Sequence, residues 1–193
     1  LRAPGTNCDR ETVHALESAQ VHAQIKRQAT TDGLTGLVNH AHFQRILAAK
    51  TKELQEARAP YTILMMDLDN FKDVNDTFGH LTGDAVLRAV GHALASSIRR
   101  EDVAARYGGE EFAVLLPQIG LLQSAPIAER IRKTVQEVRA IAEGSGGPVR
   151  VTVSIGMAAC PEDGADHQRV LEQADAALYR AKKQGKNQVC RVS

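Results

Sequence analysis

Apolar residues along the chain are arranged in two ways, which predict strands and helices in alternation. Short, nearly unbroken apolar runs predict buried strands, and apolar residues spaced three to four positions apart predict helices with one buried face. The predicted strands are residues 61–69, 102–107, 110–117, 149–159 and 187–192. The predicted helices are residues 39–57, 70–80, 121–143 and 167–185, together with a helix that carries Val86, Val90, Ala93 and Leu94. This order, with one hairpin in the middle, predicts an α+β fold with helices packed on a mostly antiparallel central sheet.

The first thirty residues differ from the rest of the chain. Residues 1–9 have the composition of a tail, and residues 10–30 form a polar segment without glycine or proline, which predicts a helix. Its apolar positions make only a faint stripe, so a coiled coil is weakly indicated and a connecting helix from an upstream domain is a second interpretation. We therefore expect a tail and connecting helix over residues 1–30 and one domain over residues 31–193.

Composition and charge exclude several classes of protein. The chain has 193 residues, of which 43% are hydrophobic and 24% charged, as in soluble globular domains. Lys and Arg number 24 against 23 acidic residues, so no bulk electrostatic attraction to nucleic acid or to a membrane is indicated. Aromatic residues make up 4% and tryptophan is absent, which argues against a stacking platform for single-stranded nucleic acid. We expect neither a nucleic-acid partner nor direct membrane contact.

The three cysteines, Cys8, Cys160 and Cys190, are far apart in the sequence. Their odd number and the lack of C-x-x-C spacing argue against a disulfide framework or a zinc site. This pattern is typical of a reducing compartment, and we expect a cytoplasmic location.

Candidate chemistry is concentrated around the stretch RYGGEEFAVLLP, residues 106–117. Its adjacent glycines predict a tight hairpin turn, but they do not explain Glu110 and Glu111 at the start of a buried strand. On a strand, Asp67 and Asp69 share one face at the end of residues 61–69, and Glu110 and Glu111 point to opposite faces. If the two strands are neighbours, Asp67 and one glutamate converge, and such an all-oxygen site suits Mg²⁺. Alternatively, these acids are simply solvated, and Asp69 caps the following helix.

Several motifs together resemble the GGDEF family of diguanylate cyclases. They are RYGGEEF, DLDNFKDVNDTFGH, TVSIG, ADAALYRAKKQGKN and TDGLTGLVNHAHF, in order over about residues 30 to 190. The resemblance implies a fold like the palm of nucleotide polymerases and adenylyl cyclases, with a ferredoxin-like core. It also implies a reaction in which two GTP condense to cyclic di-GMP and two pyrophosphates. The glycine motif is the GGEEF variant, which keeps a carboxylate at its third position. His40 and Ala41 stand where arginine is frequent in the family.

By this resemblance, Asp67 and Glu110, assisted by the Leu68 carbonyl, hold two Mg²⁺ or Mn²⁺ ions per active site. Glu111 is expected as a proton acceptor or supporting group, and Lys72 is counted with the catalytic residues. The main-chain N–H groups of Phe71 and Lys72, at a helix start, are suited to bind phosphate.

Each of the other substrate contacts implied by the resemblance has an alternative interpretation in which the residue does not bind substrate. Lys182 and Lys186, four residues apart on one predicted helix face, would reach the triphosphate, or they form a solvated basic face. Asn75 and Asp84 would accept from the guanine N1–H and N2–H₂ groups. Alternatively, Asn75 is a turn residue, and Asp84 is a favourable charge in the first turn of a helix behind Thr82.

A second ligand site is implied by Arg99 and Asp102, whose R-x-x-D spacing and offset from GGEEF match the product-inhibition site of the family. Arg130 matches a secondary arginine of this site. Arginine forks onto guanine or phosphate, and aspartate accepts from the Watson–Crick edge. For arginines alone, a solvated helix surface is the ordinary interpretation.

The symmetry of the expected product predicts a homodimer, because one site holds one GTP and the reaction joins two. A non-catalytic cyclic di-GMP receptor or signalling module is the alternative. A purine cyclase with a different product is a weaker third possibility.

Overall fold

The computed structural model describes residues 29–141 and 147–192. The predicted tail and almost all of the predicted connecting helix therefore lie outside the described residues. In chain order the elements are β1 (Val38–Asn39), α2 (His40–Glu56), β2 (Tyr61–Leu68), α3 (Phe71–Phe78), α4 (His80–Ser97), β3 (Val103–Arg106), β4 (Glu111–Pro117), α5 (Leu121–Glu137), β5 (Ala140–Ile141), β6 (Pro148–Val149), β7 (Val153–Cys160), α6 (His167–Lys183) and β8 (Val189–Arg191).

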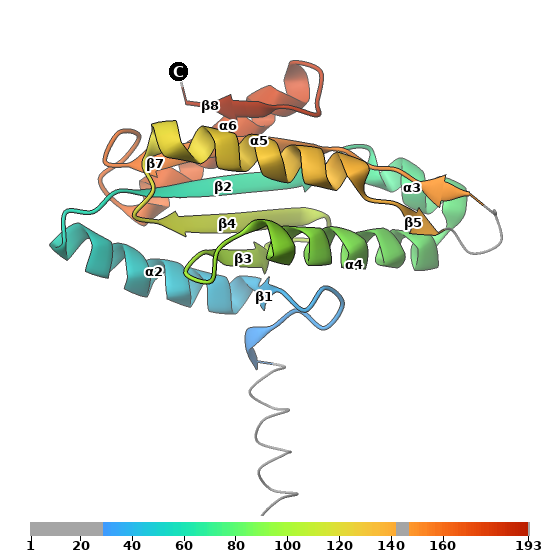
Figure 1. Ribbon diagram of the computed structural model, residues 1–193, viewed down its shortest axis with the longest axis horizontal. Helices are drawn as coiled ribbons and strands as arrows, with labels where there is room; N and C mark the ends of the chain where they lie inside the picture. Colours follow the sequence, from blue (N-terminus) through green and yellow to red (C-terminus); the bar gives the residue numbers. More distant parts are fainter. Residues whose placement is uncertain (1–28, 142–146, 193) are drawn as a thin grey trace, which may run out of the picture.

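The described strands form a six-stranded sheet in the order β1-β3-β4-β2-β7-β8 and a two-stranded sheet of β5 and β6 (Figure 1). The central strand β2 is antiparallel to both β4 and β7, and β3 is antiparallel to β4. Both edge strands run parallel to their neighbours, so the sheet is mixed. The predicted α+β fold with an antiparallel centre is confirmed, and the parallel edges are an addition to it.

Helices cover both faces of the large sheet, because alternate residues of its buried strands point to opposite sides. Leu64, Met66 and Leu68 of β2 pack in a core cluster with residues of α3, α4 and α5. Ile63 and Met65 pack in a second cluster with residues of α2 and α6. Figure 1 shows α4 and α5 on one face of the sheet. Strand β2 is therefore enclosed by apolar residues until it reaches Asp67.

Most predicted boundaries agree with the structure, and three differences have local causes. The helix predicted over residues 121–143 ends at Glu137, because Val138 adopts an extended conformation and the chain turns into β5. The strand predicted over residues 149–159 is divided into β6 and β7. The edge strand β1 was not predicted, since two residues carry no periodicity. None of the described helices has the length and apolar character needed to cross a membrane.

Packing of α6 on β7 requires a glycine at position 156. A Cβ atom added to Gly156 would lie 2.1 Å from the Ala174 carbonyl oxygen and 2.1 Å from the Leu178 nitrogen. Both atoms belong to the helix backbone, so they cannot move aside as a flexible side chain would. The sheet and helix therefore approach each other as closely as two backbones allow.

We expect Gly156→Ala to lower the free energy of unfolding by about 2–3 kcal/mol, because the added methyl group forces α6 away from β7. Urea denaturation followed by circular dichroism measures this change. Gly33→Ala is the matched control, because its added Cβ meets no atom within 4 Å, and it should change stability by less than ~0.5 kcal/mol. Equal stability of the two variants would contradict the packing described.

Candidate functional site

The carboxyl end of β2 lies beside the glycine turn that precedes β4. Asp67 is directly opposite Glu111 in the antiparallel register, and the Leu68 N–H donates to the Glu110 carbonyl at 3.2 Å. Burial, and then the negative charge of Asp67, raise the pKa of Glu110, while the charge of Lys182 opposes this increase. The structure thus brings Asp67, both glutamates and Lys182 together at the carboxyl end of the central strand β2. Glu111 shares its sheet face with Asp67, and Glu110 immediately precedes the strand.

The glycine turn is held by an arginine whose role was not predicted. Arg106 donates to the Gly109 carbonyl from Nη2 at 2.7 Å and from Nε at 3.1 Å. Its Nη1 donates to both carboxylate oxygens of Asp32 at 3.3 Å. Asp32 in turn accepts from the Thr35 hydroxyl at 2.7 Å. The TDGLTG segment therefore fixes the turn that carries Glu110, and only the match of both segments to one family hinted at this.

Lys182 contacts the oxygens that were predicted to hold a metal. Its Nζ donates to Asp67 Oδ1 and, at 3.3 Å, to the Leu68 carbonyl, and it lies 3.7 Å from Asp69 Oδ1. Among residues 29–141 and 147–192, no three His, Cys, Asp or Glu side chains are grouped closely enough to hold a metal by themselves. The site thus offers two carboxylates and a main-chain carbonyl, which suits an ion that takes its other ligands from water or phosphate.

Asp69 is buried and does not cap the helix that follows, so the solvated or capping interpretation is wrong for this residue. It accepts from the Thr152 hydroxyl at 2.7 Å, the Ser154 hydroxyl at 2.7 Å and the Asn187 N–H at 2.9 Å. Asn70 is the residue that precedes α3, and its side chain makes no capping bond. The three donors come from the approach to β7, from β7 itself and from the loop after α6, so Asp69 joins these segments.

The start of α3 presents main-chain donors beside two lysines. Asn70 has a left-handed conformation with φ 57°, and α3 begins at Phe71. The N–H groups of Phe71 and Lys72 donate to no other group among the described residues, so they are available to an anion. Lys186 Nζ donates to the Asn70 side chain. The sequence thus predicted correctly that a helix begins here.

The shared helix face predicted for Lys182 and Lys186 is wrong. Helix α6 ends at Lys183, because Gly185 and Lys186 have positive φ angles of 119° and 62°. Lys186 therefore lies in the loop beyond the helix. Its ammonium group nevertheless reaches Asn70, immediately after β2, and Lys182 reaches Asp67 near the end of the same strand.

The two residues expected to bind guanine lie where α3 and α4 contact each other. A Cβ atom at Gly83 would be 1.9 Å from Asn75 Oδ1, so the Asn75 side chain lies over Gly83, next to Asp84 in the sequence. Helix α4 begins at His80, and the Thr82 hydroxyl donates to the carbonyl of Phe78, the last residue of α3. The alternative placement of Asp84 in a first turn behind Thr82 is therefore wrong, and Asp84 lies in the second turn of α4.

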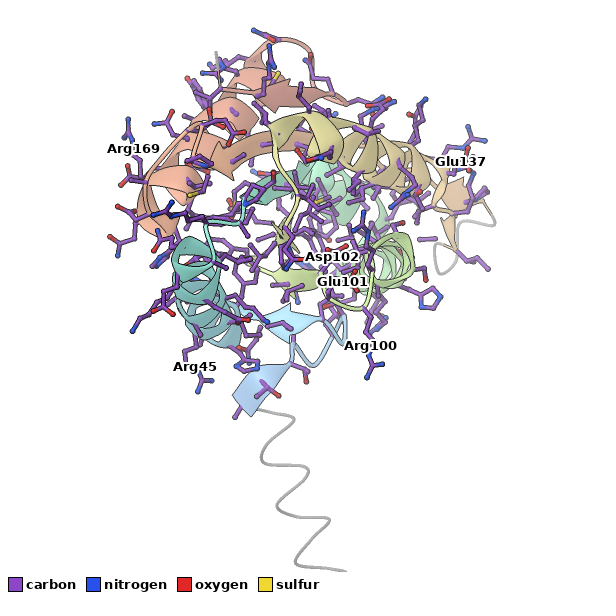
Figure 2. The ribbon with its side chains drawn as sticks, turned by 60° about the vertical axis from the view of Figure 1, so that its left-hand side comes forward. Arg45, Arg100, Glu101, Asp102, Glu137 and Arg169 are labelled. Carbon is purple, nitrogen blue, oxygen red and sulfur yellow. The ribbon has the colours of Figure 1, made fainter. Side chains whose placement is uncertain are left out.

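Arg99, Asp102 and Arg130 form a separate cluster at the loop between α4 and β3. The Arg99 N–H donates to Asp102 Oδ2 at 2.8 Å, and Arg130 donates to the Ser97 carbonyl at 2.9 Å. Burial raises the pKa of Asp102, while the charges of Arg99 and Arg130 oppose this increase. Asp102 Oδ1 is buried and accepts no hydrogen bond. In Figure 2, Arg100 projects outward from this loop, whereas Asp102 lies within the fold.

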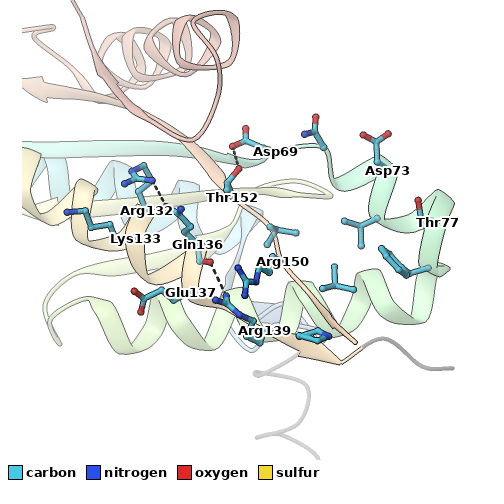
Figure 3. Close-up of a pocket in the computed structure, with 16 residues that line it drawn as sticks. Asp69, Asp73, Thr77, Arg132, Lys133, Gln136, Glu137, Arg139, Arg150 and Thr152 are labelled. Carbon is cyan, nitrogen blue, oxygen red and sulfur yellow. Dashed lines mark hydrogen bonds between the residues drawn. The ribbon is translucent and has the colours of Figure 1, made fainter. Parts of the chain in front are cut away.

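Arg132 connects α5 to the carboxyl end of β2 and was not predicted. It forms a two-bond fork with Glu129 at 2.7 and 2.9 Å and donates to Asn187 Oδ1 at 2.5 Å. Asn187 itself donates to Asp69, and Figure 3 shows Arg132 near Asp69 and Thr152. The side chain of Arg132 is only 12% exposed. A buried arginine in an otherwise ordinary helix gives no sequence signal, because its partners are distant in the chain.

We expect Asp69→Asn to lower the free energy of unfolding by about 2 kcal/mol or more, since a buried carboxylate loses charge-assisted bonds to three donors. Urea denaturation at pH 7 measures the change. Asp73→Asn is the control, because Asp73 is exposed and its side chain forms no hydrogen bond or ion pair with the described residues. If both variants were as stable as the unsubstituted protein, Asp69 would not hold these segments together.

The free energy of unfolding should depend on pH through Asp102. Because the folded-state pKa of Asp102 is raised, the folded protein retains a proton that the unfolded chain has released, and stability falls as pH rises through this interval. We expect Asp102→Asn to unfold at a higher urea concentration than the unsubstituted protein at pH 7, with the difference shrinking as the pH is lowered below the ordinary aspartate pKa. Glu101→Gln, an exposed neighbour, is the control. A difference independent of pH would contradict this explanation.

Comparison with known proteins agrees with this arrangement. The family model described as diguanylate cyclase, GGDEF domain, matches residues 29–188. The uncharacterized protein YhcK of Bacillus subtilis is 41% identical over 180 residues, which cover 92% of this chain and 49% of that protein. The probable diguanylate cyclase DgcT of Escherichia coli is 39% identical over 164 residues, which cover 85% of this chain and 36% of that protein. The chain thus spans less than half the length of these relatives.

A solved structure extends the likeness to three dimensions. The coiled coil and GGDEF domain of DgcB from Caulobacter crescentus, in complex with c-di-GMP, superposes with a TM-score of 0.86 at 34% identity. The match covers 95% of this chain and 96% of that one. The motifs, the sheet order and these matches lead to one conclusion, that the chain belongs to the GGDEF family of diguanylate cyclase domains.

Proposed function

We propose that the domain condenses two GTP into cyclic di-GMP with release of two pyrophosphates. The observation that carries the proposal is the carboxyl end of β2, where Asp67, the Leu68 carbonyl and Glu110 lie close together and Lys182 contacts the first two. Neighbouring carboxylates with a single ammonium group beside them are suited to bind further positive charge, as a metal–nucleotide complex would bring.

Asp67, Glu110 and the Leu68 carbonyl are the groups that would hold Mg²⁺ or Mn²⁺, two ions per active site. The raised pKa of Glu110 is consistent with this assignment, because it reflects first the burial of the carboxylate and then the nearby negative charge of Asp67. Such ions supply charge neutralisation on the phosphates and increase the acidity of an attacking hydroxyl group. Glu111, on the same sheet face as Asp67, is placed to accept the proton of that hydroxyl group or to support the residue that does.

Binding and orientation of GTP would come from three groups of donors and acceptors. The N–H groups of Phe71 and Lys72 and the ammonium groups of Lys182 and Lys186 suit the triphosphate. Asn75 and Asp84 offer acceptor oxygens to the guanine donors. In each condensation, a 3′ oxygen attacks the α-phosphorus of the other GTP, the P–O bond to pyrophosphate breaks, and the hydroxyl proton passes to a base.

The reaction requires two facing copies of the domain, because one set of guanine acceptors serves one GTP. A homodimer brings the two nucleotides into a symmetric arrangement in which each attacks the other. We further propose that the reaction takes place in the cytoplasm, where GTP is available and where the free Cys160 and Cys190 remain reduced.

Arg99, Asp102 and Arg130 favour product inhibition, and they also support the second candidate function, a cyclic di-GMP receptor without turnover. The unpaired, buried oxygen of Asp102 is an acceptor that a guanine edge could satisfy. DgcB, the solved relative, was crystallised with c-di-GMP. A cyclase with feedback inhibition uses both sites, whereas a receptor needs only this one.

The decisive experiment incubates the purified chain with GTP and MgCl₂ over a range of protein concentrations and resolves the nucleotides by chromatography. We expect cyclic di-GMP to form at a rate that rises more than linearly with protein concentration. Glu110→Ala should reduce the rate about a thousandfold or more, which corresponds to ~4 kcal/mol of transition-state stabilisation. Glu56→Ala, an exposed carboxylate on α2, is the matched control and should retain activity.

The same assay separates the two candidate functions. Absence of product at every protein concentration, together with cyclic di-GMP binding that Arg99→Ala abolishes, would overturn the cyclase proposal in favour of a receptor. Product formation that is strictly linear in protein concentration, in a sample shown to be monomeric, would overturn the dimer requirement.

A further inference from the structure

A cleft of about 880 Å³ is lined by none of the residues assigned to the two proposed ligand sites. It is bounded by α3, by the end of α5 and by residues 148–152, and Figure 3 shows its lining. Glu110, Asn75 and Asp84 do not line it, and neither do Arg99 and Asp102. The volume is in the range that holds a nucleotide-sized ligand.

Two arginines face each other at the mouth of this cleft. Ala140 pairs with Val149 in the antiparallel β5–β6 ladder, so the next opposed positions are Arg139 and Arg150, whose side chains share one face. Like charges directly opposite each other on neighbouring strands are unfavourable. In the described parts of the chain, neither arginine lies within 4 Å of a carboxylate, and Figure 3 shows the two guanidinium groups next to each other. This arrangement leaves positive charge that an anion would neutralise.

The geometry of Arg139 is fixed rather than free. Its Nη1 donates to the Gln136 carbonyl at 3.1 Å and to the Val138 carbonyl at 2.9 Å, which anchors the guanidinium against the end of α5. The remaining N–H groups are left for a ligand. Arg150 forms no hydrogen bond or ion pair with the described residues, so all N–H groups of its guanidinium are available to a ligand.

The other charges of the cleft do not cancel these two arginines. Arg132 is paired with Glu129, which lies outside the lining, and Asp69 is satisfied by its three hydrogen bonds. Asp73 is on α3, at the opposite wall. Figure 3 shows Glu137 with its carboxylate directed away from Arg139 and Arg150.

The wall opposite the arginines is partly apolar. Val74 and Phe78 of α3 line it, and the Phe78 side chain is 39% exposed although it is large and aromatic. Pro148 and Val149 continue the apolar surface beside the arginines. An exposed aromatic ring near paired guanidinium groups combines a surface for a planar base with donors for phosphate.

We propose that this cleft binds a phosphorylated nucleotide as a third ligand site, with the phosphates on Arg139 and Arg150 and the base against Val74 and Phe78. The site contains no residue of the proposed catalytic set, so the inference stands independently of the cyclase proposal. Its inner end includes Asp69 and Asn70, which contact Lys182 and Lys186, so that an occupant lies next to the residues that hold the lysines proposed to bind the triphosphate.

The test measures binding of ATP and of tripolyphosphate by isothermal titration calorimetry, in excess MgCl₂. We expect ATP to bind, and substitutions in the cleft show whether it binds there. The double variant Arg139→Gln/Arg150→Gln should weaken ATP binding about tenfold or more, since two charged hydrogen-bond donors are lost.

Two further variants make the test specific. Lys52→Gln/Arg191→Gln removes the same charge from exposed positions that do not line the cleft, and should leave ATP binding unchanged. Phe78→Ser should weaken binding of ATP but not of tripolyphosphate. Absence of ATP binding, or equal weakening in both charge variants, would overturn the site. Equal affinity for ATP and tripolyphosphate would overturn its assignment to a nucleotide.

Discussion

Two carboxylates at the carboxyl end of β2, Asp67 and Asp69, lie at the edge of an apolar core, and the surrounding structure depends on the compensation of their charge. A carboxylate removed from water is stable only when donors or cations replace the lost hydration. Asp69 obtains two hydroxyl groups and a main-chain N–H, and Asp67 obtains the ammonium of Lys182. Because these donors come from β7, from α6 and from the loop after it, one requirement for charge compensation fixes three segments around the site.

The same requirement explains how the site is prepared for a ligand. Lys182 lies on the oxygens of Asp67 and Leu68, which are the groups suited to a divalent cation. If an ion neutralises these oxygens, Lys182 is released to contact phosphate without leaving its position at the end of α6. The pKa of Glu110 is raised by burial and then by Asp67, and the charge of Lys182 opposes this increase. A metal-bound nucleotide, as proposed for this site, would add positive charge where these carboxylates meet.

The sequence predicted what is determined locally and missed what depends on distant partners. The apolar runs of β2 and β4 and the helix α6, expected over residues 167–185, were predicted because each shows its period within a few residues. Motif resemblance singled out Asp67 and Glu110, and the pairing of β2 with β4 brings Asp67 opposite Glu111, next to Glu110. In contrast, the end of α5, the short strands and the hydrogen bonds of Arg132 and Asp69 arise from contacts between segments far apart in the chain, which no local pattern encodes.

Net charge was the least informative property, and the structure shows why. A formal charge of +1 indicates no partner, yet it averages over local groups of opposite sign. Lys182 and Lys186 gather beside α3, Arg99 and Arg130 beside Asp102, and Arg139 and Arg150 across the β5–β6 hairpin. Phosphate is recognised by a few donors held in fixed geometry, which requires no excess of charge in the whole domain. Since Asp69 contacts Lys182 and also lines the cleft beside Arg139 and Arg150, this buried side chain adjoins both the cleft and the proposed catalytic site.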